Sequence, residues 1–191
     1  MPKLYYKYGA MGSSKSAQAL MTKFNYEQKD YNVLLIKPSI DTRSDQNGKT
    51  IIASRVGIES ICHTYSPNEN LKAYFDQLNL EKKYDVVIVD EVQFSSTSQI
   101  DDLKKISNSI PVLCFGLKTN FKGLLFEGSK RLMEIADSIT EIKSICNCGE
   151  KAIMNALLIN GKVVTEGNEI QIGGDEKYEA MCYNCWKKRQ S

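Results

Sequence analysis

Short apolar runs alternate with amphipathic segments through the first 145 residues of this chain. The apolar runs that predict strands cover residues 4–8, 33–36, 84–89 and 112–117. The last three are almost continuously apolar, which is typical of strands buried on both faces of a parallel sheet. Segments with apolar residues at helical spacing lie between or after them, at 16–28, 66–78, 98–106 and 129–136. This alternation predicts an α/β fold in which helices flank a parallel sheet.

Two of the predicted helices have recognisable start signals. Ser66 to Glu69 form a capping box with Pro67 at the first helical position, so a helix is expected to begin there. The segment from Ser98 to Asp101 resembles a second start signal. For the helix at 16–28, we expect four apolar residues to share one face: Ala17, Leu20, Met21 and Phe24.

The character of the chain changes after Ile145. Strand-like segments on either side of Asn160 and Gly161 predict a hairpin, because this pair suits a two-residue turn. Glycines and cysteine pairs surround these segments. We therefore expect two parts, a nucleotide-binding α/β domain at 1–145 and a small β-rich domain at 146–191.

Composition narrows the class of protein. The chain has 25 Lys and Arg against 23 Asp and Glu, a net charge of +2, which argues against a polybasic nucleic-acid binder. No apolar stretch is long enough for a membrane span, and the first eight residues lack a signal-peptide core. We expect a cytoplasmic protein with neither nucleic acid nor membrane as a partner, in which clustered cysteines more often bind metal than form disulfides.

A Gly- and Ser-rich octet lies between the first predicted strand and the first predicted helix. Its members are Gly9, Ala10, Met11, Gly12, Ser13, Ser14, Lys15 and Ser16. In a phosphate-binding loop, backbone N–H groups cradle the phosphates, Lys15 reaches the terminal ones and the Ser16 hydroxyl ligates Mg²⁺. Ser14 stands where the G-x-x-x-x-G-K-[ST] consensus has glycine, and a positive φ there would cost about 1 kcal/mol. Taken alone, the octet could equally be a simple turn before a helix.

Two acids follow the apolar strand at 84–89. Asp90 and Glu91 would lie at the carboxyl edge of the sheet, where the loop after the first strand also lies. Successive strand residues point to opposite sides, so the two should differ in role. One carboxylate can organise Mg²⁺ and the other can accept the proton of an attacking hydroxyl. The alternative is a strand that ends in solvated acids, which the octet at the same edge makes less attractive.

Four of the six cysteines form two close pairs, Cys146 with Cys148 and Cys182 with Cys185. Four thiolates on two turns suit a closed, structural Zn²⁺ site that would stabilise a region too small for its own core. The alternative is four unrelated free cysteines. Cys62 and Cys114 lie in apolar strands and are expected to be core thiols.

Taken together, these motifs resemble the small, oligomeric, zinc-containing thymidine kinases of bacteria, animals and poxviruses. The similarity runs from about Lys3 to Trp186. Its carriers are Gly9 to Met11, Ser13, Lys15, Ser16, Lys37 to Arg43, Asp90 to Phe94, Gly116, Leu117, Phe121, Phe126, the cysteine pairs and Gly173 to Tyr178. Ser14, Arg55 and Lys118 depart from the usual family pattern, as does the short C-x-C pair.

The resemblance implies transfer of the γ-phosphoryl group of ATP to the 5′-hydroxyl of thymidine, giving dTMP and ADP. It implies that Glu91 is the catalytic base. The implied ATP and Mg²⁺ site comprises the octet from Gly9 to Ser16 with Asp41, Arg43, Asp90 and Gln93. The implied thymidine site comprises Met11, Phe94, Leu117, Phe121, Phe126, Ile172, Gly173, Gly174 and Tyr178, part of it in a lasso segment before the last cysteines. It further implies a homotetramer that is inhibited by dTTP.

Two other function classes fit parts of the pattern. An ATPase or regulatory P-loop protein could use a zinc module to bind a partner, but it would need an attacking water and usually an arginine finger. A zinc ribbon that binds nucleic acid conflicts with the nearly neutral charge. Turnover of ATP with and without a nucleoside separates the first alternative from a kinase.

Overall fold

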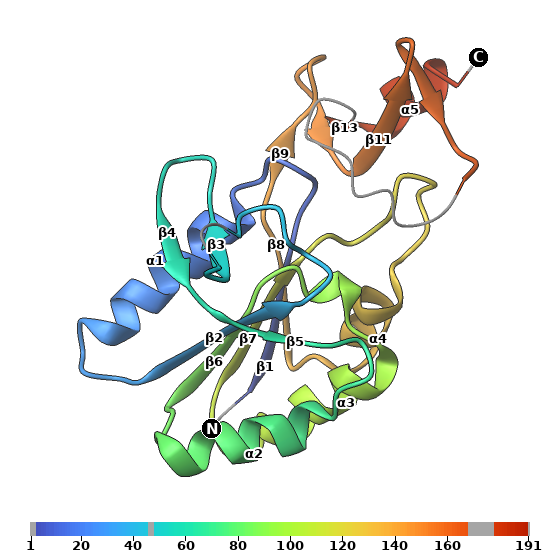
Figure 1. Ribbon diagram of the computed structural model, residues 1–191. Helices are drawn as coiled ribbons and strands as arrows, with labels where there is room; N and C mark the ends of the chain where they lie inside the picture. Colours follow the sequence, from blue (N-terminus) through green and yellow to red (C-terminus); the bar gives the residue numbers. More distant parts are fainter. Residues whose placement is uncertain (1–2, 46–47, 168–177, 191) are drawn as a thin grey trace.

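The computed structural model describes residues 3–45, 48–167 and 178–190 of the chain (Figure 1). Its first part contains β1 (Leu4–Tyr8), α1 (Lys15–Glu27), β2 (Val33–Pro38), β3 (Ile51–Ala53), β4 (Glu59–Ile61), β5 (His63–Tyr65), α2 (Leu71–Glu81), β6 (Val86–Val89), the short 3₁₀ helix η1 (Val92–Phe94), α3 (Thr97–Ile106), β7 (Val112–Gly116), α4 (Glu127–Ile135) and β8 (Ser138–Glu141). The remainder contains β9 (Ser144–Ile145), β10 (Lys151–Ala152), β11 (Met154–Ile159), β12 (Lys162–Val164), β13 (Tyr178–Met181) and α5 (Tyr183–Lys188).

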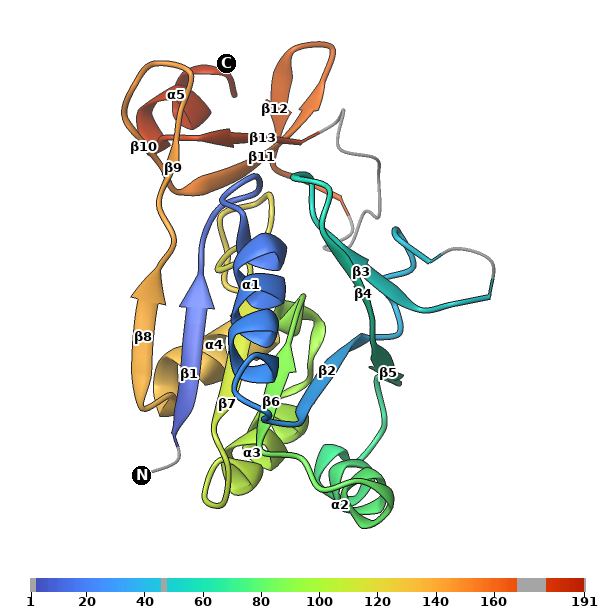
Figure 2. The same ribbon diagram turned by 90° about the vertical axis from the view of Figure 1, so that its left-hand side faces the viewer.

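Six strands form the main sheet in the order β5-β2-β6-β7-β1-β8, and each neighbouring pair is parallel. Alternate strand residues enter two separate cores. Leu34 and Val87 pack in the core that includes residues of α2, α3 and α4, whereas Leu35 and Ile88 pack with Leu20 of α1. Figure 2 shows α1 lying across one face of the sheet. The predicted α/β class with a parallel sheet flanked by helices is confirmed.

The parallel arrangement decides where the loops go. Because the carboxyl ends of β1, β2, β6 and β7 lie at one edge, the segments that follow these strands meet there. Those segments contain the Gly/Ser octet, the loop with Asp41 and Arg43, the acids Asp90 and Glu91, and Leu117.

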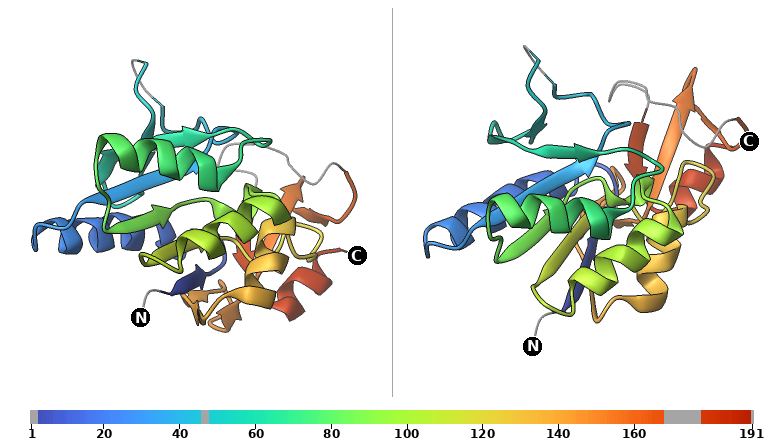
Figure 3. Two further views of the ribbon diagram at one scale, coloured as in Figure 1. Left: turned by 90° about the horizontal axis from the view of Figure 1, so that it is seen from below. Right: turned by 60° about the horizontal axis from the view of Figure 1, so that its bottom comes forward.

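A small β-rich region lies beyond this edge. In it, β12, β11 and β13 form an antiparallel sheet, and β9 pairs with β10. The views in Figures 1 and 3 show β11, β12, β13 and α5, coloured orange to red, gathered at one end of the molecule. Asn160 and Gly161 both have positive φ, at 52° and 77°, which confirms the predicted hairpin turn. The core of this region includes Ala10 of the octet beside Met154 and Trp186, so the region packs directly on that loop.

Both predicted helix starts were misplaced. Helix α2 begins at Leu71 because the Asn70 side chain accepts the Ala73 N–H, while Ser66 and Glu69 only close a turn ahead of it. Helix α3 begins at Thr97, where Ser96 and Gln99 form the capping box. Both segments contain several polar residues that can cap a helix, so the sequence pattern alone predicted the wrong N-cap in each.

The predicted helix is present as α1, but the face that carries its four apolar residues is only partly buried. Ala17 and Leu20 are buried, as expected, but Met21 and Phe24 are each 58% exposed. In the described parts of the chain, no helix has the length and apolar character that crossing a membrane requires.

Candidate active site and metal centre

A cleft of about 360 Å³ lies at the carboxyl edge of the main sheet. Five segments that are distant in sequence line it, and its members include Met11, Gly12, Ser14, Lys15, Ser16, Asp41, Arg43, Ser54, Arg55, Asp90, Glu91 and Leu117. Much of the polar set expected from the sequence is therefore brought to one place, with cations and carboxylates facing each other.

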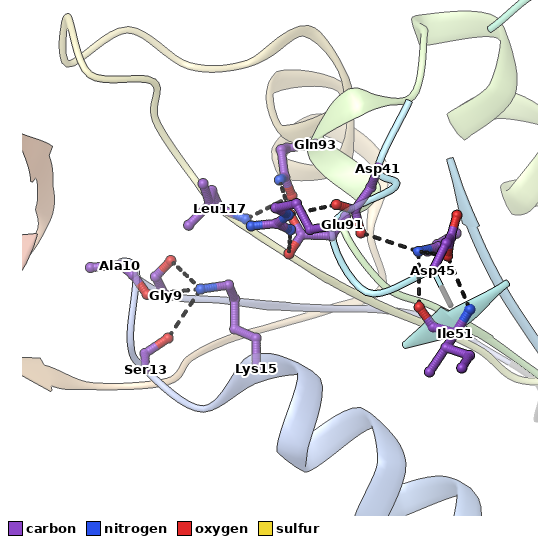
Figure 4. A network of polar contacts seen from close by, with 12 residues as sticks. Gly9, Ala10, Ser13, Lys15, Asp41, Asp45, Ile51, Glu91, Gln93 and Leu117 are labelled. Atoms are coloured by element: carbon purple, nitrogen blue, oxygen red, sulfur yellow. Dashed lines mark hydrogen bonds and ion pairs between the residues drawn. The ribbon is translucent and has the colours of Figure 1, made fainter. Parts of the chain in front are cut away.

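The Gly/Ser octet forms the loop between β1 and α1, and its lysine points into the loop. The Lys15 side chain is buried, and its ammonium donates to the carbonyl oxygens of Ala10 at 2.8 Å and Gly9 at 3.3 Å. Figure 4 shows these contacts, with Glu91 across the cleft. Burial lowers the pKa of Lys15 to about 8, and the nearby carboxylates of Glu91 and Asp90 oppose that shift.

Asp90 directly follows β6 as a buried carboxylate, only 2% exposed. Burial, and after it the charge of the neighbouring Glu91, raise the pKa of Asp90 to about 7, although a hydrogen bond from the Ser16 hydroxyl acts in the opposite direction. Within the described residues its Oδ1 atom has no hydrogen-bond partner. An unpartnered buried carboxylate oxygen beside a serine hydroxyl fits a hard divalent cation such as Mg²⁺, which takes oxygen ligands.

Glu91 is held at both carboxylate oxygens. Arg43 Nη2 lies 2.7 Å from Oε1, and Gln93 Nε2 donates to Oε2 at 2.5 Å. Arg43 also donates through Nε to Asp41, so it joins the two acids Asp41 and Glu91. The backbone at Glu91 has a φ of 52°, a left-handed conformation that few residues with a side chain adopt. Such strain is typical of functional sites, where the surroundings impose it.

One buried lysine of this site was not among the predicted site residues. The Lys37 side chain is fully buried, and its ammonium donates to Asp45 Oδ1 and to the Ile51 carbonyl, each at 2.9 Å. It also lies 3.6 Å from Asp41 Oδ2. Lys37 therefore contacts the loop that carries Asp41 and Arg43 near its start, at Asp41, and at Ile51, where the loop ends. The available signal in the sequence was a lysine near the end of an apolar strand, four residues before Asp41 and eight before Asp45.

The four predicted metal-ligating cysteines come together in the β-rich region. Their sulfur atoms all lie within 4.8 Å of one another, which is a spacing that one tetrahedral ion can bridge. Two of the sulfurs, of Cys148 and Cys182, are 3.7 Å apart. Cys62 and Cys114 lie in the two cores of the main sheet, as expected.

Comparison with known proteins agrees with this arrangement. Residues 2–186 match the family model of thymidine kinase. The chain belongs to the thymidine kinase family. The thymidine kinase of Shewanella oneidensis is 43% identical over 185 residues, which cover 95% of each chain. That of Legionella pneumophila is 40% identical over 195 residues, covering all of this chain and 92% of the relative. That of Enterobacteria phage T4 is 39% identical over 191 residues, covering 98% and 97%. The chain is accordingly a kinase.

The nucleoside-side residues implied by the family are only partly gathered at the cleft. Met11 and Leu117 line it, and Phe94 packs edge-to-face on Phe126 with ring centroids 5.7 Å apart. Phe121 is 2% exposed and belongs to the interior of its loop. Tyr178 is half-buried at the start of β13. Ile172, Gly173 and Gly174 lie outside the described residues.

A second residue that was absent from the predicted site joins the β-rich region to the part that contains the main sheet. Asn155 in β11 is 3% exposed. Its Oδ1 accepts the Met11 N–H at 2.8 Å, and its Nδ2 donates to the Thr119 carbonyl at 2.8 Å. The phosphate loop and the segment after β7 are thus bound to the cysteine-bearing region. An asparagine in an apolar strand was the available signal.

Two departures from the family pattern have structural consequences. Lys118 lies over the ring of Tyr8, 5.6 Å from its centroid, and is absent from the described lining of the cleft. Ser14 has a φ of 63°, which is the strained conformation expected at the position where the phosphate-loop consensus has glycine.

Replacing Ser14 by glycine should stabilise the protein. Glycine removes a left-handed strain of about 1 kcal/mol and loses part of that gain because the unfolded chain becomes more flexible. We expect Ser14→Gly to raise the free energy of unfolding by roughly 0.5 kcal/mol in urea titrations. Ser98→Gly, at the exposed second residue of α3, is the control and should destabilise, because glycine disfavours helix and the change removes the hydrogen bond with the Ser96 hydroxyl. A lower midpoint for Ser14→Gly would mean that the serine side chain outweighs the strain.

Proposed function

We propose that this chain transfers the γ-phosphoryl group of ATP to the 5′-hydroxyl of thymidine, giving dTMP and ADP. The main observation in support is that a buried lysine in a phosphate-type loop and a glutamate at the end of β6 face the same cleft. Membership of the thymidine kinase family supports the choice of nucleoside.

The nucleotide end of the cleft is assigned to the octet from Gly9 to Ser16. Its backbone N–H groups and the N-terminus of α1 suit the phosphates of ATP, and Lys15 and Arg43 add positive charge. Ser16 and Asp90 are the residues that would hold Mg²⁺, with Asp41 and Gln93 also on this side. The ion would supply charge neutralisation at the phosphate oxygens.

The thymidine end is assigned to Met11, Leu117, Phe94, Phe126, Phe121 and Tyr178, with Ile172, Gly173 and Gly174 in the lasso segment. Met11 and Leu117 line the same cleft as Glu91, so a nucleoside held there would present its hydroxyl to that carboxylate. Glu91 accepts the hydroxyl proton, the oxygen bonds to the γ-phosphorus, and the bond to the leaving ADP oxygen breaks.

The division into a nucleotide-binding part at 1–145 and a lasso-bearing part at 146–191 belongs to the same proposal, with one Zn²⁺ on the four cysteines. A homotetramer inhibited by dTTP completes it. The exposed Met21 and Phe24 on α1 support association, because two large apolar side chains on one helix suit burial against another copy.

ADP release measured with and without thymidine tests the proposed reaction. We expect turnover of ATP to depend on thymidine and to yield dTMP in equal amount. Equal ADP release without any nucleoside would instead indicate an ATPase.

Glu91→Gln tests the assignment of the base. The amide keeps the shape of the side chain but cannot accept the proton, so kcat should fall by roughly 10²-fold or more, with ATP binding retained. Glu134→Gln is the control, because Glu134 pairs with Arg131 on the surface of α4, and it should keep the wild-type kcat. A Glu91→Gln enzyme with nearly normal turnover would remove Glu91 from this role.

Metal analysis tests the zinc assignment. Protein purified under reducing, chelator-free conditions should contain about one Zn²⁺ per chain, because four sulfurs within 4.8 Å suit a single tetrahedral ion. Cys185→Ser should lower the zinc content, whereas Cys62→Ala, in the core of the main sheet, should keep it. A zinc-free wild type with full thymidine-dependent activity would contradict the assignment.

A further inference from the structure

The carboxylate of Glu91 has two partners of different character. Arg43, at Oε1, has a side chain that is 43% exposed and belongs to the loop after β2. Gln93, at Oε2, is only 2% exposed and belongs to η1, which packs under the cleft. The partner that can hold the carboxylate in a fixed position is therefore the glutamine.

Gln93 is itself held through its other amide atom. Its Oε1 accepts the backbone N–H of Leu117 at 3.0 Å, at the end of β7. Gly116 makes this approach possible, because a Cβ at that position would lie 2.6 Å from Gln93 Oε1 and 2.9 Å from Val92 Cγ1. With both ends of the amide engaged, its orientation is defined and its Nε2 is directed at Glu91.

The backbone of Leu117 is also bound at its carbonyl group. Its carbonyl oxygen accepts the Tyr6 hydroxyl at 2.9 Å and the Ser129 hydroxyl at 2.6 Å. Tyr6 comes from β1 and Ser129 from α4, and both residues are completely buried. One strand and one helix thus hold the backbone at Leu117, and Gln93 links this backbone to Glu91, as Figure 4 shows.

We propose that Gln93 is a positioning residue for Glu91, and that Tyr6 and Ser129 support it through the backbone of Leu117. This inference rests on the proposed role of Glu91 as the base. It differs from the nucleotide-binding role that the family resemblance implies for Gln93. Glu91 depends on such support because a left-handed backbone, here at a φ of 52°, persists only where the surrounding structure imposes it.

The two roles of Gln93 separate kinetically. A positioning residue acts on the transition state and lowers kcat, whereas a nucleotide ligand whose loss weakens ground-state binding raises the KM for ATP. In Gln93→Leu, the side-chain volume is retained and the amide is lost. We expect kcat to fall by roughly tenfold to a hundredfold, because a small displacement of the base has an effect of this size. The KM values for ATP and thymidine should stay within about threefold.

Tyr6→Phe and Ser129→Ala test whether the two hydrogen bonds to the Leu117 carbonyl support the position of Gln93. Each single variant leaves one donor on the Leu117 carbonyl, so each should change kcat by less than about threefold. The double variant leaves that carbonyl without either donor and should lower kcat more than the product of the single effects. Ser107→Ala is the matched control, because Ser107 is also buried and donates to a backbone carbonyl, that of Lys104 at 2.7 Å, at the end of α3. It should lower the Tm but keep kcat.

The outcomes are separable. Thymidine-dependent turnover of the wild type is measured first, and its absence would defeat the proposed function. If the wild type is active and Gln93→Leu keeps its kcat while the KM for ATP rises tenfold, Gln93 binds nucleotide and the inference is wrong. It is equally wrong if the folded double variant loses Tm as Ser107→Ala does, with kcat unchanged.

Discussion

The site depends on the mutual compensation of buried charges at one edge of a parallel sheet. Asp90 and Glu91 directly follow the same strand, and the charge of Glu91 and the burial of Asp90 both oppose ionisation of Asp90. The cations Lys15 and Arg43 face them across the cleft, and Lys37 holds the loop that brings Arg43 there. Lys15 and Lys37 are buried at a cost that the nearby acids reduce, whereas the Arg43 side chain is 43% exposed.

The parallel sheet is what brings these charged residues together. Because all neighbouring pairs in the main sheet are parallel, segments that are far apart in sequence end at the same edge. The β-rich region then closes on that edge through Ala10, which lies in its apolar core, and through Asn155, which binds the phosphate loop and the segment after β7. A change in the cysteine-bearing region therefore reaches the loop that faces the proposed phosphate site.

Sequence patterns were sufficient for features that depend on local chemistry. Continuous apolar runs located β2, β6 and β7, the Asn160 and Gly161 pair located the hairpin turn, and the cysteine pairs indicated a cluster. They were insufficient where several local solutions compete. The first turns of α2 and α3 each have more than one possible cap, and Asn70 and Ser96 prevailed over the predicted residues. The exposure of Met21 and Phe24 was likewise not readable from helical spacing, because the sheet covers only part of the α1 surface.

The sequence by itself determined the α/β class, the order of the motifs and the family, because strand periodicity, loop chemistry and motif spacing are properties of short segments and their order. Only the tertiary structure decided which polar groups meet. Lys37 and Asp45, Gln93 and Leu117, and Tyr6, Ser129 and Leu117 form contacts that join different elements. A hydrogen bond requires its two atoms within about 3 Å. That condition is set by how strands and helices pack, which no local pattern encodes.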